Sequence, residues 1–176
     1  LYHFGMNRDR ATLTQRAEDQ AGEIGSQSWY LSRTNIGEQL WNTGCYAEAA
    51  QVFTEILTVL GDTPTSNHCV TLGRLGRCLK SLGQLEQAEQ CCRKALTVAQ
   101  HLEQSSLVKR QTGDLLSSLA DVLMEMGDFA AAQNAYEASL AIDEEMGGNL
   151  RGKAVVKGHR TYAKALNIRG GPAQFH

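Results

Sequence analysis

A pattern of small and large apolar residues recurs along the chain. Each copy opens with a large residue before Gly or Ala, continues through a Leu and a Gly, and closes with Ala-x3-bulky. The copies are Ile36-Gly37, Leu40, Gly44, Tyr46, Ala49, Phe53; Leu75-Gly76, Leu79, Gly83, Leu85, Ala88, Cys92; Leu119-Ala120, Leu123, Gly127, Phe129, Ala132, Tyr136; and, in part, Tyr162-Ala163, Leu166, Gly170. The central Gly recurs after 39, 44 and 43 residues, and such periods are typical of repeat proteins.

Within each copy, apolar residues three or four positions apart predict helices on either side of the Gly. The predicted helices are 6–25, 28–43, 46–61, 66–82, 85–103, 106–126, 129–147 and 150–169. Gly44, Gly83 and Gly127 stand where a left-handed C-terminal cap belongs, and Ser66-Asn67 offers an N-cap. The pattern therefore predicts an all-α fold of antiparallel helix pairs.

Small residues occupy the middle of these helices, where Gly is a poor helix former. Gly37, Gly76, Ala120 and Ala163 fall on the first helix of each pair, and Ala49, Ala88 and Ala132 fall on the second. Since small residues let two helices approach closely, we expect each pair to meet at these positions.

The motif resembles the tetratricopeptide repeat, whose helix–turn–helix unit reads W-x2-L-G-x2-Y and then A-x3-F. The chain departs from it in having no closing Pro, a period above the usual value of about 34, and four other residues at the Trp position: Arg33, Leu72, Leu116 and His159. It looks like the long-helix variety seen in kinesin light chains, cell-polarity scaffolds and bacterial regulators. The resemblance implies a right-handed superhelical solenoid.

That solenoid would occupy residues 1–176 as a single domain. Its parts would be a half repeat 6–25, repeats 28–61, 66–103 and 106–147, and a half repeat 150–169. The two flanking half repeats leave two interpretations open: they cap the array, or the chain is a window of a longer one.

Composition narrows the function classes. The formal net charge is −2, which gives no global basic field for nucleic acid. No run approaches 18 apolar residues, so we expect no membrane span. Five cysteines, an odd number, and no signal-like segment favour a reducing compartment, and we expect a cytoplasmic protein.

Candidate chemistry is sparse. The cysteines form no C-x2-C pair and the histidines no His-x3-His pair, so we expect no metal site. Cys92 stands at the bulky position of its repeat, which favours core or interface thiols over ligands. No nucleophile elbow, P-loop or dinucleotide turn is present. We therefore expect no enzymatic activity and no cofactor.

By the resemblance, the first helices line a concave face on which partners lie. Four rows follow, each on one helix face: Leu31, Thr34, Glu38, Trp41; Val70, Gly73, Arg77, Lys80, with Arg74 beside them; Asp114, Ser117, Asp121, Met124, with Glu125; and Lys157, Arg160, Lys164, Asn167. We expect the peptide-binding residues to be Thr34, Glu38, Trp41, Arg74, Arg77, Lys80, Asp114, Ser117, Asp121, Met124, Lys157, Arg160 and Lys164.

The charges alternate between these rows, which leaves two interpretations open. They orient a partner, or they form inter-repeat ion pairs of small value. In the second case Arg77 would face Asp121, and Asp121 or Glu125 would face Lys164.

Two specific partners are disfavoured. The carboxylate clamp of chaperone cochaperones needs Lys, Asn and Arg where this chain has Thr34, Glu38, Arg74, Asp114 and Ser118. Residues 149–176 are basic, with no Asp or Glu, but the only aromatic beside their charges in the helix is Tyr162, at a packing position. We expect the basic residues of this helix to face the acidic end of the preceding helix rather than to bind nucleic acid.

The leading hypothesis is a scaffold that binds a protein or peptide partner in its groove. The alternatives are a sensory or regulatory segment of a larger signalling or transcription-regulating protein, and a self-associating array that forms homo-oligomers through its terminal half repeats.

Overall fold

The computed structural model describes residues 22–147 and 150–170. The predicted helix 6–25 lies outside this range except for its last four residues. Those four form a turn instead of helix, with Gly22 and Gly25 at φ of 67° and 87°. The predicted end of that helix at residue 25 is therefore wrong, because the backbone is already left-handed at Gly22.

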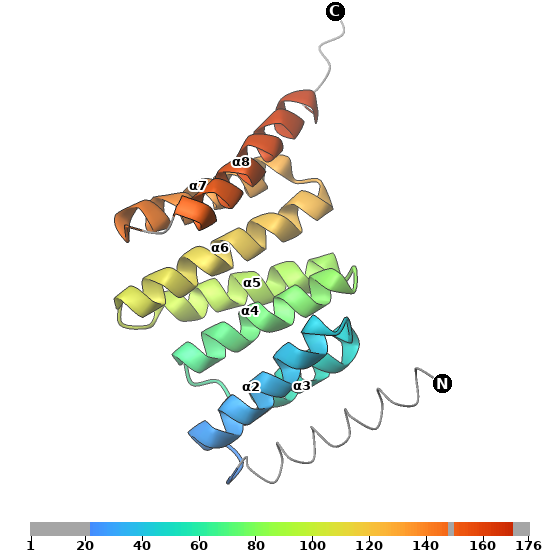
Figure 1. The fold of residues 1–176 in the computed structure, drawn as a ribbon, viewed down its shortest axis with the longest axis vertical. Coiled ribbons are helices and arrows are strands. Elements are labelled where there is room, and N and C mark those ends of the chain that lie inside the picture. The colour runs from blue at the N-terminus through green and yellow to red at the C-terminus, as the bar shows by residue number, and fades with distance from the viewer. Residues whose placement is uncertain (1–21, 148–149, 171–176) are drawn as a thin grey trace, which may run out of the picture. The chain divides into compact units, whose positions relative to one another are not determined.

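The described residues form helices and no strand, which confirms the all-α prediction (Figure 1). The seven helices within these residues are α2 (Gln27–Asn42), α3 (Tyr46–Leu60), α4 (Ser66–Ser81), α5 (Leu85–Gln100), α6 (Ser106–Met126), α7 (Phe129–Glu145) and α8 (Leu150–Gly170). Among them the largest error in a predicted boundary is at the end of α5. This helix ends three residues before the predicted end, and the N–H of the capping His101 bonds to the carbonyl of Val98.

The chain separates into two compact units at Thr63 and Pro64. The first described unit holds the α2–α3 hairpin. The second holds the hairpins α4–α5 and α6–α7 followed by α8, with α5 packed on α6, α7 packed on α8, and α4 also touching α6. The continuation of the two units as one solenoid domain stays a prediction.

The turns within the hairpins follow the predicted rule. Gly44, Gly83 and Gly127 have φ of 79°, 73° and 83°, a region that glycine enters at no steric cost. The predicted N-cap of α4 is wrong by one residue. Thr65 is extended and its hydroxyl accepts a hydrogen bond from the His68 N–H at 3.1 Å, so Ser66 becomes the first helical residue.

Small residues bring the paired helices into contact, as predicted. A Cβ at Gly37 would lie 2.6 Å from Cζ of Phe53, and one at Gly76 would lie 3.0 Å from Sγ of Cys92. Both distances are shorter than a van der Waals contact, so the bulky residue that closes each motif packs directly on the glycine that opens it.

Three of the five cysteines are core thiols, in agreement with the sequence interpretation. Cys69, Cys78 and Cys92 have no exposed surface, and Cys45 and Cys91 are half-buried. Burial raises the pKa of Cys69 to about 11 and, with the nearby charges adding to it, that of Cys92 to about 12. Thiols held this far from ionisation are poor nucleophiles.

Candidate functional site

Helices α4 and α6 share a face of the second unit that is hollowed in two places. The first hollow has a volume of about 280 Å³ and the second about 240 Å³. The first hollow is lined by Cys69, Val70, Gly73, Arg74, Arg77, Gln111, Asp114, Leu115 and Ser118. The second hollow is lined by Lys80, Asp121, Met124, Glu125, Tyr136, His159 and Tyr162.

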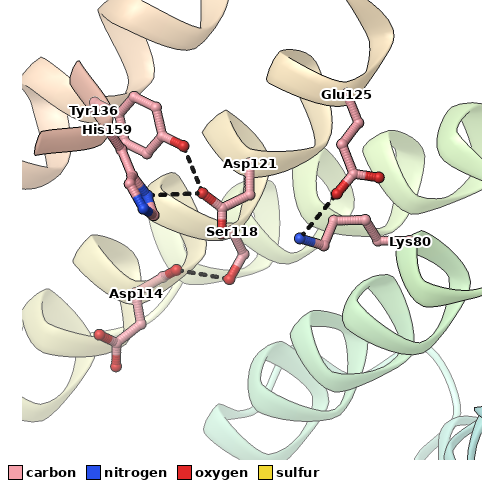
Figure 2. Close-up of polar contacts among 7 residues, drawn as sticks. All are labelled: Lys80, Asp114, Ser118, Asp121, Glu125, Tyr136 and His159. Carbon is pink, nitrogen blue, oxygen red and sulfur yellow. Dashed lines mark hydrogen bonds and ion pairs between the residues drawn. The ribbon is translucent and has the colours of Figure 1, made fainter. Parts of the chain in front are cut away.

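One row of polar residues on α6 connects the two hollows. Asp114 and Ser118 line the first hollow, and Asp121 and Glu125 line the second. Steps of four, three and four residues keep all four on one side of the helix, as Figure 2 shows. The Ser118 hydroxyl donates to the backbone carbonyl of Asp114 at 2.9 Å, an ordinary bond within a helix.

The first hollow has charged walls over a floor of small and apolar residues. Arg74 and Arg77 stand on α4, and Asp114 stands on α6. Gly73 belongs to the floor, where a Cβ would lie 2.6 Å from Cδ2 of Leu115. A larger residue at this position would therefore require the Leu115 side chain to shift.

The carboxyl of Asp114 has a raised pKa. Partial burial is the main cause, the Asp143 carboxylate adds to it, and the Arg110 guanidinium acts in the opposite direction. Desolvation and a like charge both disfavour the ionised form. A donor that approaches Asp114 would relieve part of this cost.

The second hollow is organised around the carboxylate of Asp121. The hydroxyl of Tyr136 donates to its Oδ1 at 2.5 Å, and Nδ1 of His159 lies 3.5 Å from the same oxygen (Figure 2). Burial raises the pKa of Tyr136, and the Asp121 hydrogen bond and charge raise it further, so the phenol stays a donor. The ring of His159 meets that of Tyr136 edge-on at 5.7 Å.

A charged pair lies on the other side of this hollow. Nζ of Lys80 lies 3.3 Å from Oε1 of Glu125 and joins α4 to α6 (Figure 2). Asp121 and Glu125 thus contact His159 and Lys80, not the Arg77 and Lys164 of the ion-pair interpretation, which is wrong in its partners.

Tyr162 does not pack as expected, since 62% of its surface is exposed. The aligned Leu119 is 5% exposed, because α6 is covered by both α5 and α7. Among the described helices only α7 packs extensively on α8. The Tyr162 ring is therefore left to line the second hollow.

The hollows bring together six of the predicted site residues: Arg74, Arg77 and Asp114 in the first, and Lys80, Asp121 and Met124 in the second. Ser117 is half-buried on α6 and lines neither hollow. On α8, the predicted Lys157, Arg160 and Lys164 line neither hollow, and His159 and Tyr162 take that place.

The predicted residues of the first unit lie on α2. Thr34 is 5% exposed, Glu38 is half-buried, and the half-buried Trp41 ring lies 6.2 Å from that of Tyr46. Because the two units are separate bodies, a joint surface of these residues with α4 and α6 stays a prediction.

Sequence analysis missed the Tyr136–Asp121–His159 cluster, although the repeat alignment contained a signal. Tyr136 is the bulky residue that closes the third motif, and His159 holds the Trp position of the next copy. Both positions face the boundary between consecutive repeats. Polar groups at both, with an Asp on the helix between, could have marked the cluster.

None of the described helices is long and apolar enough to cross a membrane. No group of three or more His, Cys, Asp or Glu side chains within residues 22–147 and 150–170 is arranged to hold a metal ion.

Solved structures with a similar fold are numerous. A kinesin light chain with TPR-like repeats from Podosopora anserina superposes with a TM-score of 0.69 at 16% identity, covering 96% of this chain and 81% of its own. PcrH of Pseudomonas aeruginosa, in complex with the chaperone-binding region of PopD, gives 0.63 at 17% identity, with 82% and 95% covered. The Yersinia enterocolitica translocator chaperone SycD gives 0.64 at 16%, with 85% and 99% covered.

Comparison of the sequence with family models identifies the part of the chain that matches a known family. No curated protein matches the chain, but the model of the tetratricopeptide repeat matches residues 68–145. This segment contains nearly all of α4 and the whole of α5, α6 and α7. It therefore includes both α4 and α6, the two helices that share the hollowed face. With the fold shared by the solved structures, residues 68–145 of this chain belong to the tetratricopeptide repeat family.

Proposed function

We propose that the chain is a protein-interaction scaffold whose α4–α6–α8 face binds a segment of a partner protein. The observation that carries the proposal is the pair of hollows joined by the α6 row Asp114, Ser118, Asp121 and Glu125. Concave sites that mix an apolar floor with a few placed polar groups are the usual form of a binding site.

The lining suits a peptide better than a small metabolite. Both hollows are open and lie in line along one helix, and Leu115 and Met124 offer apolar contacts between charged walls. The two parts of the α6 row, one in each hollow, have midpoints about seven residues apart. At a rise of 1.5 Å per residue, the midpoints are separated by roughly 10 Å. An extended segment spans that distance with about three residues.

Preorganisation supplies the mechanism. The helices are held by close contacts such as Gly76 on Cys92, so the hollows do not have to be built when the partner binds. The entropy cost of binding then falls mainly on the partner segment. The PcrH structure offers a precedent for this fold, since PcrH is described with the chaperone-binding region of PopD.

The proposed contacts on the second unit are those of the hollows. The predicted Thr34, Glu38 and Trp41 of the first unit extend the surface only if the two units form one groove, and Lys157, Arg160 and Lys164 would act at its rim. The sensory or regulatory role in a larger protein stays a prediction.

Self-association through α8 is less well supported. Tyr162 and Ile168 are 62% and 73% exposed, but six residues at 3.6 per turn place them about 120° apart around the helix. They therefore do not form one apolar stripe. Homo-oligomer formation through the half repeats stays a prediction, which light scattering during size exclusion tests directly.

The proposed function is tested by selecting a displayed library of random peptides on the protein. Ser118→Trp should fill the first hollow and reduce the affinity of selected peptides at least tenfold. Gln90→Trp adds the same ring to an exposed position on α5 and should leave affinity unchanged. Peptides that bind both variants and the parent equally would show that the α4–α6–α8 face is not the binding site.

A further inference from the structure

The second hollow has a charge and a set of walls that select one type of side chain. Its Asp, Glu and Lys residues are Asp121, Glu125 and Lys80, so two carboxylates stand against one ammonium group. The carboxylates are accessible: the side chains of Asp121 and Glu125 are 34% and 51% exposed.

Each of the two carboxylates makes its described contacts through one oxygen. The contacts of Asp121 with Tyr136 and His159 are made by Oδ1, and the contact of Glu125 with Lys80 is made by Oε1. Within the described residues, Oδ2 of Asp121 and Oε2 of Glu125 make no hydrogen bond or ion pair. The two residues that carry these oxygens lie one helical turn apart on α6.

Aromatic and thioether groups complete the walls. Tyr162 lines the hollow with most of its ring exposed, and Met124 lies between the two carboxylates in sequence. A cation placed over a tyrosine ring gains from the ring quadrupole, and a planar guanidinium can stack on the ring while its N–H groups point at carboxylates.

We infer that the second hollow binds an arginine side chain of the partner segment. This inference rests on the proposed function, because it names the chemistry of the partner at one of the two hollows. Two carboxylate acceptors and an exposed tyrosine match a guanidinium, which forms several directed hydrogen bonds at once. An acidic side chain would meet the surplus negative charge.

If the second hollow binds arginine, substitutions of the two partners in the Lys80–Glu125 ion pair should change peptide affinity in opposite directions. Glu125→Gln removes an acceptor and leaves Lys80 without its partner, so it should weaken binding of an arginine-containing peptide about tenfold. Lys80→Gln removes the competing cation and frees Glu125, so it should strengthen binding severalfold. Loss of a merely structural contact would move both variants in the same direction.

The experiment uses peptides from the library selection and their arginine-to-citrulline analogues, which keep the shape but lose the charge. We expect selected peptides to share an arginine, and citrulline to lower affinity for the parent about tenfold but for Glu125→Gln less than twofold. A Glu144→Gln variant, altered at an exposed carboxylate of α7 outside the hollow, should behave as the parent.

A small probe separates this inference from the proposed function. N-acetyl-arginine amide should shift the Met124 methyl signal in an NMR titration, and N-acetyl-citrulline amide should not. Peptides that bind the face without a basic residue would overturn the inference and leave the proposed function standing. Failure to select any peptide, with the Met124 shift present, would overturn the proposed function and leave the cation preference of the hollow.

Discussion

The first and third repeats use the same position of the motif in different ways. In the α2–α3 hairpin, Phe53 is 1% exposed and presses its ring on Gly37. In the α6–α7 hairpin, Tyr136 is equally buried beside the aligned Ala120, but its hydroxyl reaches Asp121 at the rim of the second hollow. One oxygen atom is the chemical difference between the two bulky residues.

The difference shows how a repeat can acquire a site without changing its packing. A buried phenol must find a hydrogen-bond partner, and Asp121 provides it while also contacting His159. The position that only fills the core in the first repeat therefore connects the core to a polar surface cluster in the third.

The largest effect on stability is expected from a substitution that disrupts the helix packing of the first repeat. Gly37→Leu places a branched side chain where even a Cβ would lie 2.6 Å from the Phe53 ring. Because that ring is buried in the core, we expect a loss of about 3 kcal/mol in the free energy of unfolding. Urea denaturation followed by circular dichroism measures it.

Two further substitutions by Leu serve as comparisons for Gly37→Leu. Ala120→Leu in the third repeat should cost less, about 1–3 kcal/mol, since a Cβ is already accommodated there. Gly158→Leu on α8 adds the same side chain where a Cβ meets nothing within 4 Å, and should be neutral or stabilising. Equal losses at Gly37 and Gly158 would contradict the close contact.

Tyr136→Phe removes the hydroxyl that bonds to Asp121. It gives this position of the third repeat the residue type of the first. Hydrogen bonds to charged groups contribute about 1.5–3 kcal/mol, but Asp121 is one-third exposed and water can replace the phenol. We therefore expect a loss of about 1 kcal/mol in thermal denaturation. An unchanged melting temperature would show that the bond adds nothing to stability.

The smallest effect concerns Asp114, whose aligned residue in the first repeat is the half-exposed Leu31. Its pKa is raised in the folded protein, so the native state binds the proton more tightly and stability falls as pH rises through the raised value. Asp114→Asn should therefore stabilise the protein at pH 7, by a few tenths of a kcal/mol after screening.

The gain should disappear in acid, where Asp114 is protonated in both the folded and the unfolded chain. Denaturation of the parent and the variant at pH 7 and pH 3 measures the difference. A variant less stable than the parent at pH 7 would indicate that the fold stabilises the Asp114 charge, and that the pKa of this carboxyl is lowered instead of raised.

Most of the fold followed from the sequence because its signals are local. Gly44 and Gly83 mark turns whose backbone only glycine adopts cheaply, and the predicted helices on either side of them differ from the structure by three residues at most. The exception is the end of helix 6–25. There the backbone is already left-handed at Gly22, three residues before the predicted end.

The candidate site was predictable on α4 and α6 but not on α8. The rows predicted on α4 and α6 supply Arg74, Arg77 and Asp114 to the first hollow and Lys80, Asp121 and Met124 to the second, and their role in binding stays a prediction. Since α7 alone among the described helices packs extensively on α8, Tyr162 is a lining residue and not the predicted packing residue. Side-chain exposure at such a helix depends on its neighbours, which repeat spacing does not report.

The order of the helix contacts also has a consequence for how the chain folds. Within the second unit the most extensive contacts join helices that follow one another in sequence, and α4 with α6 is a less extensive, longer-range pair. Chains with such local contacts close short loops first and fold quickly. A hairpin such as α4–α5 can thus complete its turn at Gly83 during synthesis, before the residues of the next repeat have left the ribosome.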